Sequence, residues 1–412
     1  MTKNLDPSNL CLTERGTQWL NQFKPEDKET AERLVSHLTL VSHSEFLRSI
    51  QKLIETEIGS NKDVVAIYVV RELEGQTNFF SEVCDKNGHV QALSNGNDHG
   101  SEASIANLIR NLCKTEQRLL NHPNLDKMRQ KKCRTIILVD DFIGSGNRMQ
   151  SFLHAFWRHA SIKSWHSLKY IKFIVVAYSG MEAGIKIVKS HKINADVILE
   201  RECPSFKDMP WKPKYKKEAI ELCREYGKKT CKKDLPLGYK NTMGSMVFEH
   251  GCPNNVPSMF WADNKKWHAL FPHRSLLSNE MSVFPQEITR QDSKLTLLNA
   301  GQKKIADSDS LSRRGEAGET VLLILALIAQ GQRKQSTLSY ATGLNKKDCA
   351  RIVDRCIKWG FITQTKRLTS KGSAELQAAK RFKKNSKFSQ LGRGKLWARI
   401  PQNGKLNPVL LG

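Results

Sequence analysis

The segment from Arg134 to Asn147 constrains the fold of this chain more than any other. It contains the apolar run Ile136-Ile-Leu-Val139, two adjacent carboxylates, Asp140 and Asp141, and the turn Gly144-Ser-Gly146. Such an apolar run is typical of a strand buried on both faces, as in a parallel sheet. The carboxylates should emerge together at its carboxyl end. The glycine turn can aim backbone N–H groups at an anion where the next helix begins.

Three further apolar runs predict strands of the same kind, with helical periodicity between them. We expect these strands at Val64–Val70, Ile171–Tyr178 and Ala195–Leu199. The alternation predicts an α/β fold, a doubly wound parallel sheet with helices on both faces and a helical cap or insertion. Ligands of such sheets bind beyond the carboxyl ends of the strands. The acidic pair and the glycine turn should therefore lie where a ligand binds.

The charge of the chain predicts a polyanionic partner. Sixty-six Lys and Arg residues against 41 Asp and Glu give a formal net charge of +25, and nucleic acid is the first candidate. The longest apolar run, Val321–Ala329, is too short to span a bilayer, and the first residues lack the apolar core of a signal peptide. We therefore expect a cytoplasmic protein that does not bind membranes. The cysteines lack metal-ligand spacing, so no protein-bound metal is predicted.

Changes in composition predict four regions along the chain. Residues 1–275 should form the α/β domain, and residues 276–315, which are polar and without periodicity, a linker. A compact α+β domain is expected at residues 316–375, followed by a basic tail at residues 376–412.

The domain at residues 316–375 resembles a winged helix, because a helix, a helix–turn–helix and a basic two-stranded wing follow one another. The basic tail adds cations interleaved with aromatic residues, a pattern that suits phosphate contact and base stacking. A winged helix can also serve in dimerisation or protein docking, and that alternative stays open. The predicted nucleic-acid contacts are Lys346, Lys347, Arg351, Arg355, Lys366, Arg367, Lys371, Lys383 and Lys384.

The acidic pair and its loop resemble the phosphoribosyl pyrophosphate motif of type I phosphoribosyltransferases, in which two acidic residues follow four hydrophobic ones and precede a Thr/Gly-rich loop. The resemblance implies that Asp140 and Asp141 hold the ribose hydroxyls. It also implies that the loop residues hold the 5′-phosphate. The chain has Ser145 and Arg148 where that family usually has Thr, and Arg148 can pair with phosphate or point away. The predicted phosphate-binding residues are Gly144, Ser145, Gly146, Asn147 and Arg148.

Two other segments complete the predicted site. Arg71 and Glu72 follow the first strand, at the position of the family's pyrophosphate loop, where Arg71 could neutralise a leaving pyrophosphate. Bound pyrophosphate would bring Mg²⁺ as cofactor. A solvated loop remains the alternative there. For the base or acceptor, amides and aromatic faces suggest Asn254, Asn255, Trp261 and Arg274, with turn asparagines and core aromatics as the alternative.

Residues 20–275 resemble a bacterial conflict-system branch of the phosphoribosyltransferase superfamily, which shares the Pro-Asn-Asn and Phe-Trp segments. Fused to a winged helix, this domain resembles the effectors of retron anti-phage systems. The resemblance implies a toxic transferase or nucleosidase that acts on a phosphoribosyl or nucleotide substrate. A reverse transcriptase and its branched RNA–DNA product would hold it inactive. The alternative is a transcription regulator that binds duplex DNA and senses a phosphoribosyl ligand without turnover. Arg148 keeps that alternative open.

Overall fold

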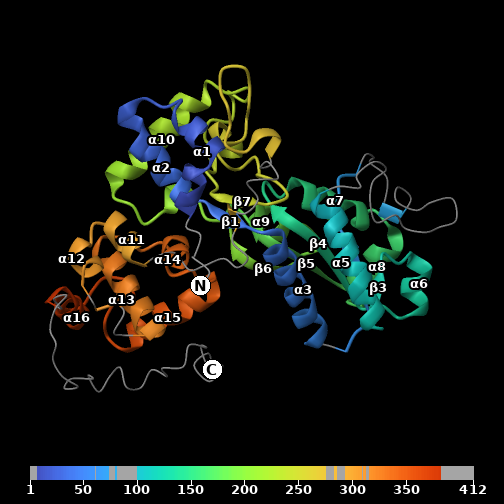
Figure 1. Cartoon of the computed structure of the whole chain (residues 1–412). Coiled ribbons are helices and arrows are strands. Elements are labelled where there is room, and N and C mark those ends of the chain that lie inside the picture. Colours follow the sequence, from blue (N-terminus) through green and yellow to red (C-terminus); the bar gives the residue numbers. More distant parts are fainter. Residues whose placement is uncertain are drawn as a thin grey trace. The chain divides into compact units, whose positions relative to one another are not determined.

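In the computed structural model of the chain, the four apolar runs and a short further strand form one five-stranded sheet in which every pair of neighbouring strands is parallel (Figure 1). The strand order is β3-β2-β4-β5-β6. The three central strands are buried almost throughout, which explains their uninterrupted apolar sequence. The strands are β2 (Val65–Val69), β3 (Leu119–Asn121), β4 (Thr135–Ile143), β5 (Lys172–Gly180) and β6 (Asp196–Glu202).

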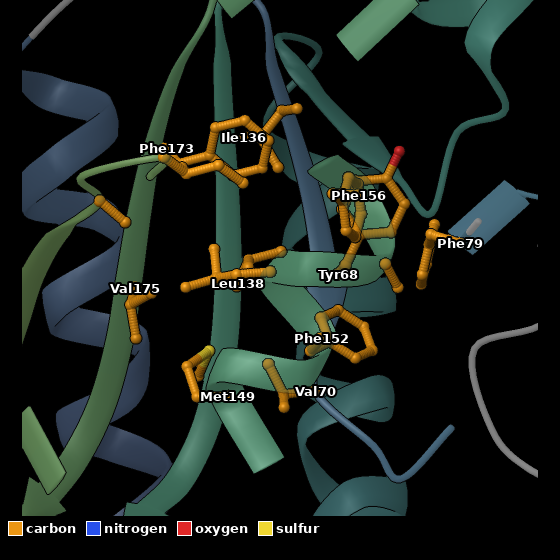
Figure 2. Packing of buried hydrophobic residues seen from close by; sticks show 14 of the residues in the cluster. Tyr68, Val70, Phe79, Ile136, Leu138, Met149, Phe152, Phe156, Phe173 and Val175 are labelled. Carbon is orange, nitrogen blue, oxygen red and sulfur yellow. The ribbon is translucent and has the colours of Figure 1, made fainter. Parts of the chain in front are cut away.

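Helices cover both faces of this sheet. On one face, α3 buries Phe46, Ile50 and Ile54, a spacing of four residues that places them on one side of the helix. On the other face, Figure 2 shows Phe152 and Phe156 of α7 among side chains of the strands. The doubly wound α/β prediction is thus confirmed. The first face carries α3 (His43–Gly59) and α5 (Ser101–Thr115), and the second carries α6 (Leu125–Gln130), α7 (Asn147–Trp157), α8 (Ala160–Ser167) and α9 (Glu182–Lys189).

The chain divides into two units. The first contains Met1–Cys203 and Leu222–Ile288, and the second contains Pro204–Glu221 and Thr289–Gly412. The boundary between them falls within α10 (Pro213–Gly227). The structure describes residues 7–60, 62–73, 79–80, 100–274, 283–284, 293–308, 310–311 and 315–381.

The remainder of the first unit is a cap rich in aromatic side chains. Trp19 stacks on Phe260 with ring centroids 5.3 Å apart and meets Trp267 edge-on at 6.5 Å. Two short strands from distant parts of the chain pair in parallel beside it. The elements of this region are α1 (Glu14–Leu20), α2 (Lys28–Ser36), β1 (Thr39–Val41) and β7 (Met246–Phe248).

The second unit has the predicted order of helices and a short wing. Gly343, with φ +68°, makes the turn between α14 and α15, and an antiparallel bridge between Ile362 and Leu368 forms the wing. Its helices are α11 (Ser293–Asn299), α12 (Lys303–Ala306), α13 (Gly315–Ala329), α14 (Gln335–Thr342), α15 (Lys346–Lys358) and α16 (Ser370–Arg381).

The structure differs from the expected domain boundaries in two places. Residues expected to form a linker contain α11 and α12, whose Leu297 and Ile305 are fully buried in the core of the second unit. These helices are only seven and four residues long, too short to show a clear helical period. In addition, the segment Pro204–Glu221, expected in the α/β domain, belongs to the second unit. There the Gln332 side chain donates a hydrogen bond to the backbone oxygen of Trp211 (3.0 Å).

In the part of the chain that the structure describes, no helix combines the length and the apolar character needed to cross a membrane.

Candidate functional site

The candidate site lies where strand β4 extends past the end of its neighbour β2. The last aligned pair between these strands is Val69 with Val139, whereas β4 stays paired with β5 as far as Ile143 and Gly180. From the sequence, Asp140 and Asp141 were expected to emerge at the carboxyl end of the strand. In the structure, both lie within the last part of β4, which continues to Ile143. Among the described residues, no strand pairs with this part of β4 on the side of β2.

The glycine turn is held in place by close backbone packing. Gly146 has φ +82° and caps α7. A Cβ atom on Gly184 of α9 would lie 2.3 Å from the backbone oxygen of Gly144. Behind the turn, a Cβ on Gly144 would lie 2.6 Å from the Asn255 side-chain oxygen. The turn thus has glycine where any side chain would collide, and its backbone stays accessible to an anion.

Arg148, in the first turn of α7, reaches back to the acidic pair. One of its terminal nitrogens donates hydrogen bonds to Oδ1 of Asp140 and to Oδ1 of Asp141, the latter at 3.1 Å. The other terminal nitrogen lies 3.6 Å from Oε1 of Glu102, near the start of α5. One guanidinium thus pairs with three carboxylates. The charge of Asp140 is the main reason why the pKa of Arg148 lies above its usual value.

His250 holds the other oxygen of Asp141. Its Nε2 lies 3.2 Å from Asp141 Oδ2, and its ring is stacked on Phe248 with centroids 5.0 Å apart. The ring also lies 4.9 Å from that of Phe46. Aromatic packing therefore fixes the imidazole in a position where it can hydrogen-bond the carboxylate.

The two carboxylates differ electrostatically. Burial raises the pKa of Asp140 well above its ordinary value, and the neighbouring charge of Asp141 adds to this, against the opposite effect of Arg148. Burial would also raise the pKa of Asp141. The hydrogen bond with His250 and the charge of Arg148 outweigh burial, however, and lower the pKa of Asp141 below its ordinary value. The pKa values of the two adjacent carboxylates are thus shifted in opposite directions, that of Asp140 upward and that of Asp141 downward.

The acidic pair, Arg148 and His250 line one open pocket of about 510 Å³. This volume lies in the range of small-molecule and cofactor sites. Ten of the residues predicted for the site line it: Glu72, Asp140, Asp141, Gly144, Ser145, Gly146, Arg148, Asn254, Asn255 and Arg274.

Three predicted residues are not among those lining the pocket. Trp261 is buried and donates its indole N–H to the backbone oxygen of Val256 (2.8 Å), so it packs in the cap. Asn147 is exposed on the first turn of α7. Arg71 is buried next to the site; burial of His122 and, to a lesser extent, the charge of Arg71 lower the pKa of His122 to about 3.

The two asparagines and Arg274 have different surroundings. Asn254 is exposed, whereas Asn255 is buried, and its side-chain nitrogen donates to the Thr242 hydroxyl (3.0 Å). Asn255 therefore supports the glycine turn from behind. The Arg274 side chain donates to the backbone oxygen of Cys252 (2.6 Å) and is exposed at the pocket.

Reasoning from sequence missed three residues of the site. His250 lies two positions after the short strand β7, a signal that could have suggested it. Glu102 lies near the start of α5, where burial raises its pKa and its Oε1 lies 3.6 Å from Arg148. Gly184 gave no signal, because its contact with the glycine turn arises only when α9 packs beside β4.

In the second unit, the predicted nucleic-acid contacts that the structure describes fall on α15, the wing and the first turn of α16. Lys346, Lys347, Arg367 and Lys371 are exposed. The partly exposed cations make local contacts: Arg351 lies 3.4 Å from Asp348, and Lys366 donates to Gln335 (3.2 Å). Arg355 is also partly exposed, and Lys383 and Lys384 lie outside the described residues.

The fold and the pocket define a phosphoribosyltransferase-like α/β domain joined along the chain to a winged-helix module. Residues 17–273 match the family described as PRTase-CE. This match covers more than half of the chain, and the chain belongs to that family. Residues 322–395 match the family described as wHTH-PRTase associated. No curated protein matches the chain. No solved structure matches it either.

Proposed function

We propose that this chain is a toxic effector of a bacterial retron anti-phage system. Its first unit would bind a phosphoribosyl or nucleotide ligand and act at the anomeric carbon of the ribose, by transfer or by hydrolysis. The observation that carries this proposal is the pocket, in which the acidic pair and the glycine turn lie side by side. Carboxylates suit vicinal hydroxyls, and a glycine turn at a helix start suits a phosphate.

The residues of the pocket have separate roles in this proposal. Asp141, kept ionised by His250 and Arg148, would accept hydrogen bonds from the ribose hydroxyls. Positive charge that develops on the sugar as the leaving group departs would be stabilised by Asp141 and Glu72. Arg274 would meet the negative charge of the leaving group. Mg²⁺ would be held mainly by the phosphates of the substrate, with Glu72 as a carboxylate that lines the pocket.

The winged-helix module would contact nucleic acid through α15 and the wing. In the proposed system, a reverse transcriptase and its branched RNA–DNA product bind the chain and hold it inactive. Support comes from the pairing of a PRTase-CE domain with its associated winged helix in one chain, and from the net charge of +25.

Expression of the chain alone tests the proposal. The wild type should stop bacterial growth, and the double variant Asp140→Asn/Asp141→Asn should be harmless. In calorimetry with Mg²⁺ present, the purified wild type should bind phosphoribosyl pyrophosphate and the double variant should not.

A matched control removes two carboxylates elsewhere in the same unit. Glu26 and Glu32 are exposed on the cap, so Glu26→Gln/Glu32→Gln should remain as toxic as the wild type. Equal toxicity of the wild type and the Asp140→Asn/Asp141→Asn variant would contradict the proposal.

The second candidate is a DNA-binding transcription regulator with a non-catalytic sensor domain. The pairing of Arg148 with the acidic pair favours it, because this guanidinium occupies the oxygens that a ribose would need. A sensor would bind phosphoribosyl pyrophosphate without consuming it and would change its affinity for an operator. Release of pyrophosphate during incubation with extracted metabolites would exclude this candidate.

A further inference from the structure

Arg148 neutralises the part of the pocket that is proposed to hold the ribose. Three of the four carboxylate oxygens of Asp140 and Asp141 already accept hydrogen bonds within the protein. Asp140 Oδ1 accepts from Arg148 and from the backbone N–H of Asp141, and Asp141 Oδ1 accepts from Arg148 and from the backbone N–H of Phe142. His250 holds Asp141 Oδ2. A diol that enters the pocket has to compete with these groups.

Among these partners, Arg148 is the one that a ligand can displace. Backbone donors are fixed in the strand, and the His250 ring is packed between Phe46 and Phe248. The Arg148 side chain is 31% exposed, compared with 4% for Asp140, and it lines the pocket. A long side chain with an open path to solvent can move away without disturbing the core.

The same side chain starts from the proposed phosphate site. Arg148 is the second residue of α7, and Gly146, which caps this helix, belongs to the glycine turn. A phosphate bound at the turn would thus offer the guanidinium a second anionic partner within the same helical turn. Arginine pairs with phosphate in a bidentate geometry that matches its planar group.

We propose that Arg148 makes the pocket select riboses that carry a 5′-phosphate. The phosphate would draw the guanidinium away from Asp140 and Asp141, and the freed carboxylates would then accept the ribose hydroxyls. A ribose without phosphate would have to displace Arg148 with nothing to replace its ion pairs. Binding of the two parts of the ligand is thus coupled, and the coupling is reciprocal. This inference rests on the proposed function and names the ligand class of that same site.

The test compares ribose 5-phosphate with ribose in ligand-observed NMR titrations of the full chain. The wild type should bind ribose 5-phosphate far more tightly than ribose. In Arg148→Gln, ribose should bind about tenfold more tightly than in the wild type, so the preference for the phosphorylated sugar shrinks. Inorganic phosphate should strengthen ribose binding to the wild type and leave ribose binding to Arg148→Gln unchanged.

The matched control is Arg158→Gln. Arg158 is exposed at the end of the same helix, so its loss removes one positive charge without touching the acidic pair, and the preference should stay as in the wild type. Thermal unfolding of each variant checks that it is folded, and Arg148→Met, which also removes the charge and keeps a long side chain, replaces Arg148→Gln should that variant not fold.

Two outcomes would overturn the inference, and they differ from each other. If ribose 5-phosphate binds and the preference is the same in the wild type and in Arg148→Gln, Arg148 only holds α5, β4 and α7 together, and the proposed function is unaffected. If ribose 5-phosphate binds to neither protein, the proposed function itself fails, and this inference fails with it.

Discussion

At the scale of single residues, the acidic pair shows how two adjacent carboxyl groups acquire different pKa values from their surroundings. Asp140 is almost fully buried beside β5, and its carboxyl is shielded from water. Asp141 has the backbone N–H of Phe142, the ring of His250 and the guanidinium of Arg148 around it. Donors that stabilise a charge keep Asp141 ionised, whereas burial favours the protonated form of Asp140.

Neutral substitutions should reveal this asymmetry in the free energy of unfolding. The raised pKa of Asp140 means that its contribution to stability is present below its ordinary value of 3.8 and is lost as pH rises through the folded-state pKa. In Asp140→Asn no carboxyl titrates at this position, so the variant does not lose stability there as pH rises. The free energy of unfolding of the variant, relative to that of the wild type, should therefore increase between pH 4 and pH 7. Denaturant unfolding at several pH values measures the difference.

Asp141→Asn should behave in the opposite way. A lowered pKa contributes stability above the ordinary value of 3.8, which is lost as pH falls through the folded-state pKa. The variant should lose about 1–3 kcal/mol at pH 7, because charge-assisted hydrogen bonds are removed. Equal effects of the two substitutions across the pH range would show that the carboxylates are equivalent.

The predictions for single residues depended on the local context of each residue. The acidic pair and the glycine turn are contiguous in sequence, so their common place could be predicted. Trp261 could not be assigned, because stacking on a base and packing in a core require the same kind of side chain. The partner of Arg148 could not be predicted either. Arg148 pairs with Glu102 of α5 and with the acidic pair of β4, and these residues become neighbours only when α5 packs against the sheet.

At the scale of elements, the site depends on how α9 and α7 approach the end of β4. Gly184 of α9 lies against Gly144 and Gly146, and the space between them is too small for a Cβ atom. The neighbouring atoms belong to the backbone and cannot rotate away. The close approach of these segments therefore fixes the position of the glycine turn.

Substitution of Gly184 by Ala should displace the turn. Alanine favours a helix over glycine by about 1 kcal/mol, so any loss would come from the collision with Gly144. We expect the affinity for phosphoribosyl pyrophosphate to fall by about tenfold or more, while the protein stays folded. Calorimetric titration and thermal unfolding measure the two effects.

Gly59→Ala is the control for this substitution. Gly59 ends helix α3, and a Cβ atom there would meet nothing within 4 Å. This variant should bind like the wild type. If Gly184→Ala also binds like the wild type, the turn does not depend on its packing against α9.

The elements themselves were predictable where they are long and uniform. The runs that became β2, β4 and β5 are buried on both faces, so their sequence is apolar without alternation. Strand β3 has only three residues, and its place at the sheet edge comes from pairing with β2. The extension of β4 to Ile143 could not be predicted, because β5 stabilises it across the sheet through pairs such as Phe142 with Ser179.

At the scale of the whole molecule, two family matches divide the chain in the order that the sequence suggested. The segment Pro204–Glu221 is the exception, since it belongs to the unit that contains the winged helix. Lys334 pairs with Asp208 of this segment at 2.8 Å, in addition to the bond between Gln332 and Trp211. The winged-helix unit is thus built from two separate parts of the chain.

Removal of two exposed lysines from α15 should reduce nucleic-acid binding in a way that salt reveals. In the full chain, Lys346→Ala/Lys347→Ala should weaken binding to duplexes of unrelated sequence to a similar extent. The slope of log affinity against log salt concentration should decrease by about two, because each lost phosphate contact releases about one counterion fewer. Fluorescence anisotropy at several salt concentrations measures this slope.

Lys189→Ala/Lys192→Ala is the charge-matched control. Both lysines are exposed and lie in or just after α9, in the other unit. This variant should keep the slope of the wild type. A wild-type slope for Lys346→Ala/Lys347→Ala would mean that the winged helix does not contact nucleic acid through the start of α15, and would favour a protein-docking role.

The sequence by itself determined the α/β sheet, the placement of the acidic pair and the glycine turn at its carboxyl edge, and the helical order of the winged-helix domain. Local patterns suffice for these features, because burial on two faces, glycine turns and helical periodicity depend on nearby residues. The tertiary structure alone decided that the pKa values of the two carboxylates shift in opposite directions and that Arg148 pairs with both. It also decided that His250 and Gly184 support the site and that Pro204–Glu221 joins the second unit. These features depend on contacts between residues far apart in the chain, and their energies exist only once the chain is packed.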